Sequence, residues 1–226
     1  MMVTNNRKKS ILVCLVGMDG TGKSTLSKKL VENMNEHGIK TRYVWSGLEP
    51  LLLRPFFWIG KALFIPRHEL ATPINYVRSA KTMRKVLRNP LIRTVYESIF
   101  YLDYSLHLLW KIRIPMMRGE CVVSDRYVYD VLIDLAVILS YTERKMSIIL
   151  RAFKRFLPQP SLVLLIDAPE EVTIKRKDDI PSITHLSERR GLYLSLAKQY
   201  GFTVLNGGST LPVLQSTIWD AVREIS

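Results

Sequence analysis

A glycine-rich segment between two regular elements constrains the fold more than any other feature. Residues 17–24 read Gly-Met-Asp-Gly-Thr-Gly-Lys-Ser, which fits the Walker A pattern at every fixed position. The apolar run Ile11 to Val16 precedes it, and Gly22 to Glu36 has helical periodicity that ends at His37-Gly38. This strand-loop-helix order lets backbone N–H groups and a helix N-terminus converge on phosphate groups.

The loop also carries the side chains that nucleotide chemistry needs. We expect Lys23 to bridge the β- and γ-phosphates of ATP and Ser24 to supply a hydroxyl to Mg²⁺, with Thr25 beside it. The residues expected to bind ATP are Gly17, Asp19, Gly20, Thr21, Gly22, Lys23, Ser24 and Thr25. An ordinary glycine-rich turn is disfavoured because both flanking elements match the motif.

Beyond this loop, strands and helices alternate, which is typical of a parallel sheet in a single α/β domain. Strands are predicted over 42–45, 120–124, 161–167 and 202–205. Residues 48–117 contain no convincing strand and are expected to form a helical substrate region, broken near Pro55, Pro66, Pro73 and Pro90. The polar stretch 175–182 is expected to be a mobile loop within a lid over 175–190.

A second motif, Asp125-Arg126-Tyr127, follows the predicted strand 120–124. The carboxyl ends of parallel strands form the edge where open α/β sheets bind ligands. Asp125 is therefore expected to reach the metal's water shell or the acceptor, and Arg126 to hold an acceptor phosphate. The alternative is that Asp125 caps the helix containing 128–139 and Arg126 is only solvated.

Four segments together resemble the thymidylate kinases, in that family's order and at similar spacings. They are Gly17 to Thr25, Glu49-Pro50, Asp125-Arg126-Tyr127, and Glu188 to Tyr193 running into Leu196-Ala197. The resemblance extends from Ile11 to the C-terminus, with the Walker A segment specific only to the superfamily. It implies a P-loop NTPase fold, Mg-ATP, transfer of the γ-phosphoryl group to a nucleoside monophosphate, and a homodimer.

The resemblance also assigns roles to residues. Asp19 would face the acceptor's sugar hydroxyl and Arg126 its phosphate, and Glu49, Tyr104 and Tyr127 would contribute to substrate binding. Because the P-loop carries no Arg at its variable positions, a transition-state cation is expected from the lid. The candidates are Arg176, Arg189 and Arg190. For Arg189 and Arg190, a solvated position on a helix surface without a role in catalysis is an equally weighted alternative.

Two departures from the family bear on the acceptor. Tyr104 stands where thymidylate kinases carry the Arg that reads the base, and 128–134 lacks the small and polar residues that accompany thymidine recognition. Asp130 and Asp134 lie four apart and could share one helix face, which would suit a hydroxyl-bearing acceptor. A position on the helix surface is the favoured interpretation of both.

Composition leaves several partners open. The net charge of +13 creates a positive field that attracts phosphates, nucleic acid or anionic membranes. No DNA- or RNA-binding motif accompanies it, so a nucleic-acid partner is not expected. The apolar segment 51–66 is too short and interrupted to span a bilayer and could contact a membrane peripherally, although dimer packing or a core position is favoured. Cys14 and Cys121 fit reduced core residues in the cytoplasm.

These features predict a doubly wound sheet with strand order 2-3-1-4-5, helices on both faces and an enlarged helical region. The expected reaction is Mg-ATP-dependent phosphoryl transfer to a nucleoside monophosphate, with dTMP the first candidate. One alternative is a related kinase acting on a sugar or lipid-linked phosphate. Another is a nucleotide-gated binding protein without kinase turnover.

Overall fold

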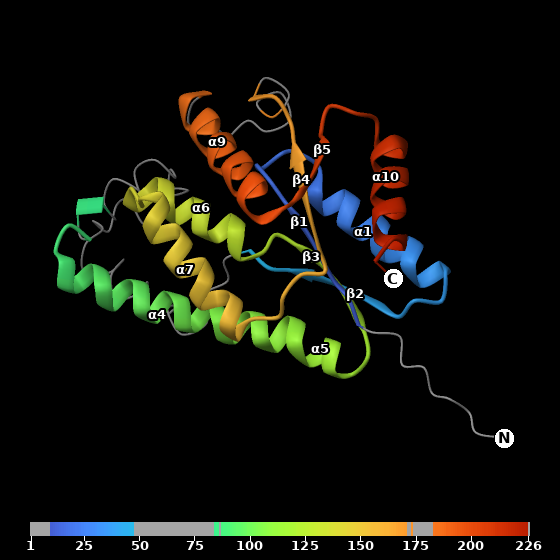
Figure 1. Ribbon diagram of the computed structural model, residues 1–226, viewed down its shortest axis with the longest axis horizontal. Helices are drawn as coiled ribbons and strands as arrows, with labels where there is room; N and C mark the ends of the chain where they lie inside the picture. Colours follow the sequence, from blue (N-terminus) through green and yellow to red (C-terminus); the bar gives the residue numbers. More distant parts are fainter. Residues whose placement is uncertain (1–9, 48–83, 86, 171–172, 174–182, 226) are drawn as a thin grey trace, which may run out of the picture.

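The computed structural model describes residues 10–47, 84–85, 87–170, 173 and 183–225. Five parallel strands form one sheet in the order β2-β3-β1-β4-β5, as predicted (Figure 1). The strands are β1 (Leu12–Val16), β2 (Thr41–Trp45), β3 (Cys121–Asp125), β4 (Leu162–Asp167) and β5 (Thr203–Asn206). Every end lies within one residue of its predicted position.

The central strands are apolar because helices cover both faces of the sheet. All five residues of β1 are buried, and Val13 lies in register with Val123 of β3 and Leu162 of β4. Strands that are buried on both faces read as continuous apolar runs rather than as alternating patterns. This explains why β1 and β4 could be recognised in the sequence.

Two helical layers enclose the sheet, which gives the three-layer P-loop NTPase architecture (Figure 1). On one face, α1 (Lys23–Glu36) and α10 (Leu211–Arg223) pack around Leu30 and Ile218. On the other lie α6 (Val128–Leu139), α7 (Glu143–Phe156) and α9 (Ile183–Tyr200). The phosphate-binding loop leaves the sheet between these layers.

A long helical rod precedes β3. Helix α4 (Pro90–Leu108) continues through the π-helical turn η2 (Leu109–Arg113) into α5 (Ile114–Met117). The break predicted near Pro90 is the start of α4, where the Asn89 side chain accepts from the backbone N–H of Leu91. Asparagine followed by proline is a strong helix start signal. No helix in the described ranges has the length and apolar character needed to span a membrane.

Several predictions concern residues outside the described ranges. These are the breaks near Pro55, Pro66 and Pro73, the apolar segment 51–66, the mobile loop 175–182, and the side chains of Glu49 and Arg176. Residues 183–190 of the predicted lid form the first turns of α9.

Candidate phosphate-binding and acceptor site

The phosphate-binding loop occupies residues 17–22, between the end of β1 and the start of α1. Its glycines have positive φ angles, 139° at Gly17, 83° at Gly20 and 89° at Gly22. A Cβ at Gly17 would lie 2.7 Å from the carbonyl oxygen of Ile166, so both conformation and space require glycine there. The tight path is what allows loop amides to point at a phosphate group.

Lys23 is folded back onto this loop. Its Nζ donates to the carbonyl oxygen of Met18 at 2.5 Å, and the Thr21 hydroxyl donates to the same oxygen at 2.9 Å. Burial lowers the pKa of Lys23 to about 8, although the Asp130 carboxylate acts in the opposite direction. The ammonium group therefore lies where a bound phosphate could replace the Met18 carbonyl as its partner.

Ser24 and Asp125 connect the loop to the end of β3. The Ser24 hydroxyl donates to Asp125 Oδ2 at 2.5 Å, and the Tyr43 hydroxyl donates to the same oxygen at 2.9 Å. Asp125 Oδ1 is buried and has no hydrogen-bond partner among the residues that the structure describes. A carboxylate oxygen of this kind fits a cation or a cation-bound water, which is the chemistry expected of Mg²⁺. Thr25 follows on the exposed first turn of α1.

Mg²⁺ at this site would be held by few side chains of the described residues. Within the described ranges, no three His, Cys, Asp or Glu residues cluster closely enough to form a metal cage. Mg²⁺ typically binds one or two protein groups and completes its shell with water and substrate phosphates. Ser24 and Asp125 fit that pattern. The alternative role of Asp125 as a helix cap is wrong, because Tyr127 occupies the N-cap of α6.

Arg126 points from the β3 end toward the loop. Its guanidinium forms an ion pair with Asp19, and its backbone has a φ of 71°, which is unusual for a residue other than glycine. Burial opposes its charge, but the carboxylates of Asp130, Asp19 and Asp134 raise the pKa of Arg126 above its ordinary value. A phosphate entering the site would meet a guanidinium already fixed at the P-loop.

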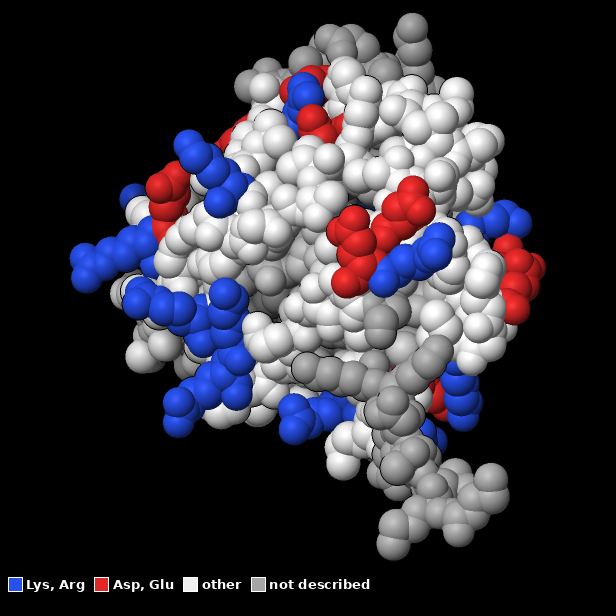
Figure 2. All heavy atoms as spheres, turned by 45° about the vertical axis from the view of Figure 1, so that its right-hand side comes forward, with Lys and Arg blue, Asp and Glu red and all other residues white. Residues whose placement is uncertain are grey.

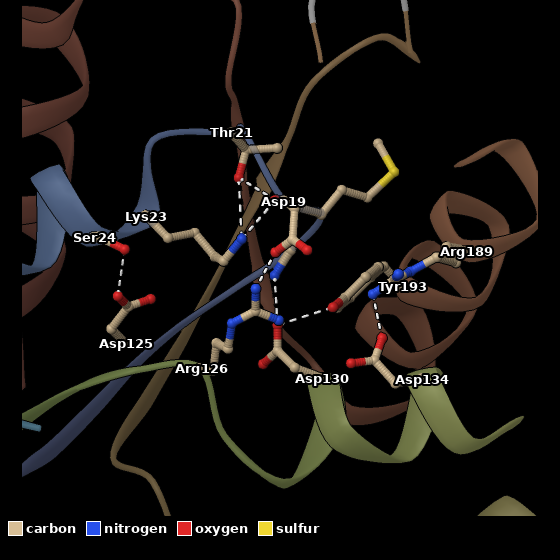
Figure 3. Close-up of polar contacts among 12 residues, drawn as sticks. Asp19, Thr21, Lys23, Ser24, Asp125, Arg126, Asp130, Asp134, Arg189 and Tyr193 are labelled. Carbon is tan, nitrogen blue, oxygen red and sulfur yellow. Dashed lines mark hydrogen bonds and ion pairs between the residues drawn. The ribbon is translucent and has the colours of Figure 1, made fainter. Parts of the chain in front are cut away.

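Asp130 lies inside the site rather than on a helix surface, so the favoured interpretation of this residue is wrong, whereas the side chain of Asp134 is 33% exposed. Asp130 is fully buried, and Asp134 forms an ion pair with Arg189 of α9 (Figure 3). The physical reason is that α6 packs on nearly all sides, with ten of its residues buried. A helix that is apolar all round is a buried helix, and that signal was present in the sequence.

The two tyrosines expected at the acceptor use their hydroxyl groups elsewhere. Tyr104 is buried and donates to the Ser46 carbonyl oxygen at 2.8 Å. Tyr127 is buried and donates to the Pro158 carbonyl oxygen at 2.6 Å. Both side chains therefore hold main-chain segments in place, and the structure does not bring either hydroxyl to the P-loop.

The two arginines of α9 have different surroundings. Arg190 donates to both carboxylate oxygens of Asp167, at 2.7 and 2.8 Å, and to Glu170 at 3.0 Å. Arg189 is turned toward α6 and its partner Asp134. Only Arg189 therefore shares a carboxylate neighbourhood with Arg126, since Asp134 also acts on the charge of Arg126.

No family model matches the chain. The chain is similar to a probable thymidylate kinase of Metallosphaera sedula, with 24% identity over 91% of this chain and 88% of that protein. It is 26% identical to probable thymidylate kinase 1 of Saccharolobus solfataricus, over 86% of this chain and 87% of that protein. A probable thymidylate kinase of Sulfurisphaera tokodaii is 28% identical, over 88% of each chain.

Proposed function

We propose that this chain, a divergent relative of the thymidylate kinases, is a Mg-ATP-dependent nucleoside monophosphate kinase with dTMP as its first candidate acceptor. The observation that carries the proposal is the contact between Ser24 and Asp125. It joins a phosphate-binding loop to the turn that bears Arg126, so donor and acceptor groups meet at one edge of the sheet. Phosphoryl transfer requires that proximity above all.

Each side chain has a role in positioning or charge neutralisation. The loop amides and Lys23 bind the donor phosphates, and Ser24 and Asp125 would hold the metal. Mg²⁺ would neutralise charge on the phosphate oxygens when bound. Arg126 binds the acceptor phosphate, which displaces Asp19 from the guanidinium. Asp19 is then available to accept a hydrogen bond from an acceptor hydroxyl.

Arg189 is the preferred transition-state cation among the described residues. Two carboxylates, Asp167 and Glu170, already neutralise Arg190. Arg189 has Asp134 as its ion-pair partner, on the face of α6 that also bears Asp130 near Arg126. A cation added to developing charge on the transferring group lowers the barrier directly.

The proposal includes a homodimer in the cytoplasm. Exposed apolar side chains run along the rod formed by α4, η2 and α5, and we call this set the apolar stripe. It consists of Leu91, Val95, Leu102, Leu106, Trp110 and Met117. Exposed apolar side chains that recur along one helical rod are typical of an interface. The cytoplasmic location rests on the free, buried thiols of Cys14 and Cys121.

The deciding experiment is ADP release from Mg-ATP with a panel of acceptors: dTMP, dUMP, other nucleoside monophosphates, and sugar and polyprenyl phosphates. Lys23→Ala serves as the blank, because it removes the ammonium group at the loop. We expect dTMP to stimulate ADP release well above the other acceptors. Stimulation only by a sugar or lipid phosphate would replace the nucleoside monophosphate with that class of acceptor. Slow ATP hydrolysis that no acceptor stimulates would favour a nucleotide-gated binding protein.

A further inference from the structure

Asp130 joins three parts of the site through its hydrogen bonds. The side chain has no exposed surface, and its two oxygens accept from three donors. Oδ1 accepts from the backbone N–H of Gly17 at 3.2 Å and from the Tyr193 hydroxyl at 2.8 Å. Oδ2 accepts from the backbone N–H of Tyr127 at 3.0 Å.

The three donors belong to three separate parts of the site. Figure 3 shows one of them, the Tyr193 hydroxyl, beside Asp130. Gly17 is the first residue of the phosphate-binding loop, Tyr127 follows Arg126, and Tyr193 lies on α9 four residues after Arg189. Because Asp130 is enclosed and both oxygens are engaged, it has no surface to offer a substrate. Its contacts can act only through the residues that it holds.

Asp130 is also a buried charge close to two cations. Burial raises the pKa of Asp130, while Arg126 and Lys23 act to lower it. The relation is mutual, since the charge of Asp130 favours the protonated form of Lys23. A buried carboxylate without such partners would be strongly unfavourable. The carboxylate and the two cations therefore stabilise one another before any phosphate is bound.

We propose that Asp130 is a positioning residue, which fixes the P-loop amide, the Arg126 turn and α9 relative to one another through its three hydrogen bonds. This inference rests on the proposed function, because it assumes that the P-loop and Arg126 bind the donor and acceptor phosphates. It adds a role for a residue that no motif identifies.

Asp130→Asn tests the contacts to the P-loop and to the Arg126 turn, because it replaces one acceptor oxygen with an NH2 group of similar size. An NH2 group cannot accept a hydrogen bond, so the variant loses its bond to the backbone N–H of either Gly17 or Tyr127. Binding of a non-hydrolysable ATP analogue with Mg²⁺ would be measured by calorimetry, and kcat by ADP release. We expect kcat to fall about tenfold, as for one lost hydrogen bond, because transfer needs the P-loop and Arg126 to be held in place together.

Tyr193→Phe tests the contact to α9 and decides the matter if Asp130→Asn does not fold. It removes one donor from Asp130 while leaving the P-loop contact, so analogue affinity should be retained and kcat should fall about fivefold, as expected for one lost hydrogen bond. Tyr101→Phe is the matched control, because Tyr101 loses a hydroxyl contact with Tyr141 outside the site. Its kcat should equal that of the unmodified protein.

The outcomes are distinguishable. A folded Asp130→Asn variant whose kcat equals that of the unmodified protein would leave Asp130 as part of the scaffold only and overturn the proposal. Equal kcat values for Tyr193→Phe and Tyr101→Phe would overturn the contact to α9. Failure of the unmodified protein to bind the analogue would instead overturn the proposed function, and this inference with it.

Discussion

Arg126 has a backbone conformation that residues with a Cβ rarely adopt. Its φ is 71°, its N–H donates to the Leu15 carbonyl oxygen at 2.9 Å, and its own carbonyl accepts from the Ser124 hydroxyl at 2.7 Å. Such conformations cost on the order of 1–3 kcal/mol and persist only where the surroundings impose them. Here the conformation turns the guanidinium toward Asp19 and the P-loop.

This strain can be measured by comparing Arg126→Gly with Arg126→Ala. Both variants lose the guanidinium, so both should lose acceptor-dependent ADP release. Glycine adopts positive φ without steric cost, so Arg126→Gly should be about 1 kcal/mol more stable than Arg126→Ala. Urea unfolding of the two proteins gives the difference. Equal stability, or greater stability of the alanine variant, would mean that the backbone is not strained at this position.

At the scale of elements, two contacts join α6 and α9. Asp130 pairs with Tyr193 and Asp134 with Arg189, so residues four apart on one helix meet residues four apart on the other. The spacing places each pair on one face of its helix, and the order shows that the helices run antiparallel. This arrangement fixes Arg189 relative to the P-loop.

The Asp134 contact should make stability depend on pH. Burial raises the pKa of Asp134 from its ordinary 3.8 to about 6, although Arg189 acts to lower it. The folded carboxyl then binds a proton more readily than the unfolded one. Its contribution to the free energy of unfolding therefore falls as pH rises from about 4 to about 6.

Asp134→Asn should abolish that fall. Urea unfolding across the same pH range should find the variant gaining stability relative to the unmodified protein as pH rises. Arg189→Gln should move the fall to higher pH, because it removes the cation that favours the Asp134 carboxylate. Parallel curves for all three proteins would contradict this account.

The elements themselves were largely predictable, because each depends on local signals. Apolar runs marked β1, which is buried throughout, and β4, which is buried from Leu164 to Ile166. Residues 128–139 were recognised as one helix. The Walker A loop and the Asp125–Tyr127 turn each carry their residues within a few positions. Both could therefore be identified before the fold was known.

The rest of the site depends on contacts between distant residues. Asp130 lies 113 positions from Gly17 and 63 from Tyr193, and no local pattern encodes those pairs. The hydroxyl of Tyr104 donates to the carbonyl oxygen of Ser46, 58 positions away. Aligning Tyr104 with the base-reading Arg of the family could therefore not indicate where the Tyr104 side chain points. The clue that was overlooked is composition, since two Asp residues in an otherwise apolar helix are expected to be buried and paired.

At the scale of the whole molecule, the surface carries both gathered basic side chains and the apolar stripe. Basic side chains gather on one part of the face in Figure 2, in keeping with the net charge of +13. The apolar stripe instead follows the rod that ends at β3, and it includes Trp110, which is 74% exposed. A positive field steers anionic nucleotides, whereas an apolar face with an aromatic residue favours contact with another protein surface.

A second copy of the chain is the proposed occupant of the stripe, and a single charge tests it. Leu106 lies in the middle of the stripe and is 47% exposed, so Leu106→Glu should leave the monomer folded. In a dimer the new carboxylate would be buried without a partner, which costs several kcal/mol and should shift the equilibrium to monomer. Sedimentation velocity measures the change. Leu211→Glu on α10, where Leu211 is 42% exposed, is the matched control and should remain dimeric. A monomeric unmodified protein, or a Leu106→Glu variant that sediments with the control, would remove the dimer from the proposal and leave the stripe to another partner.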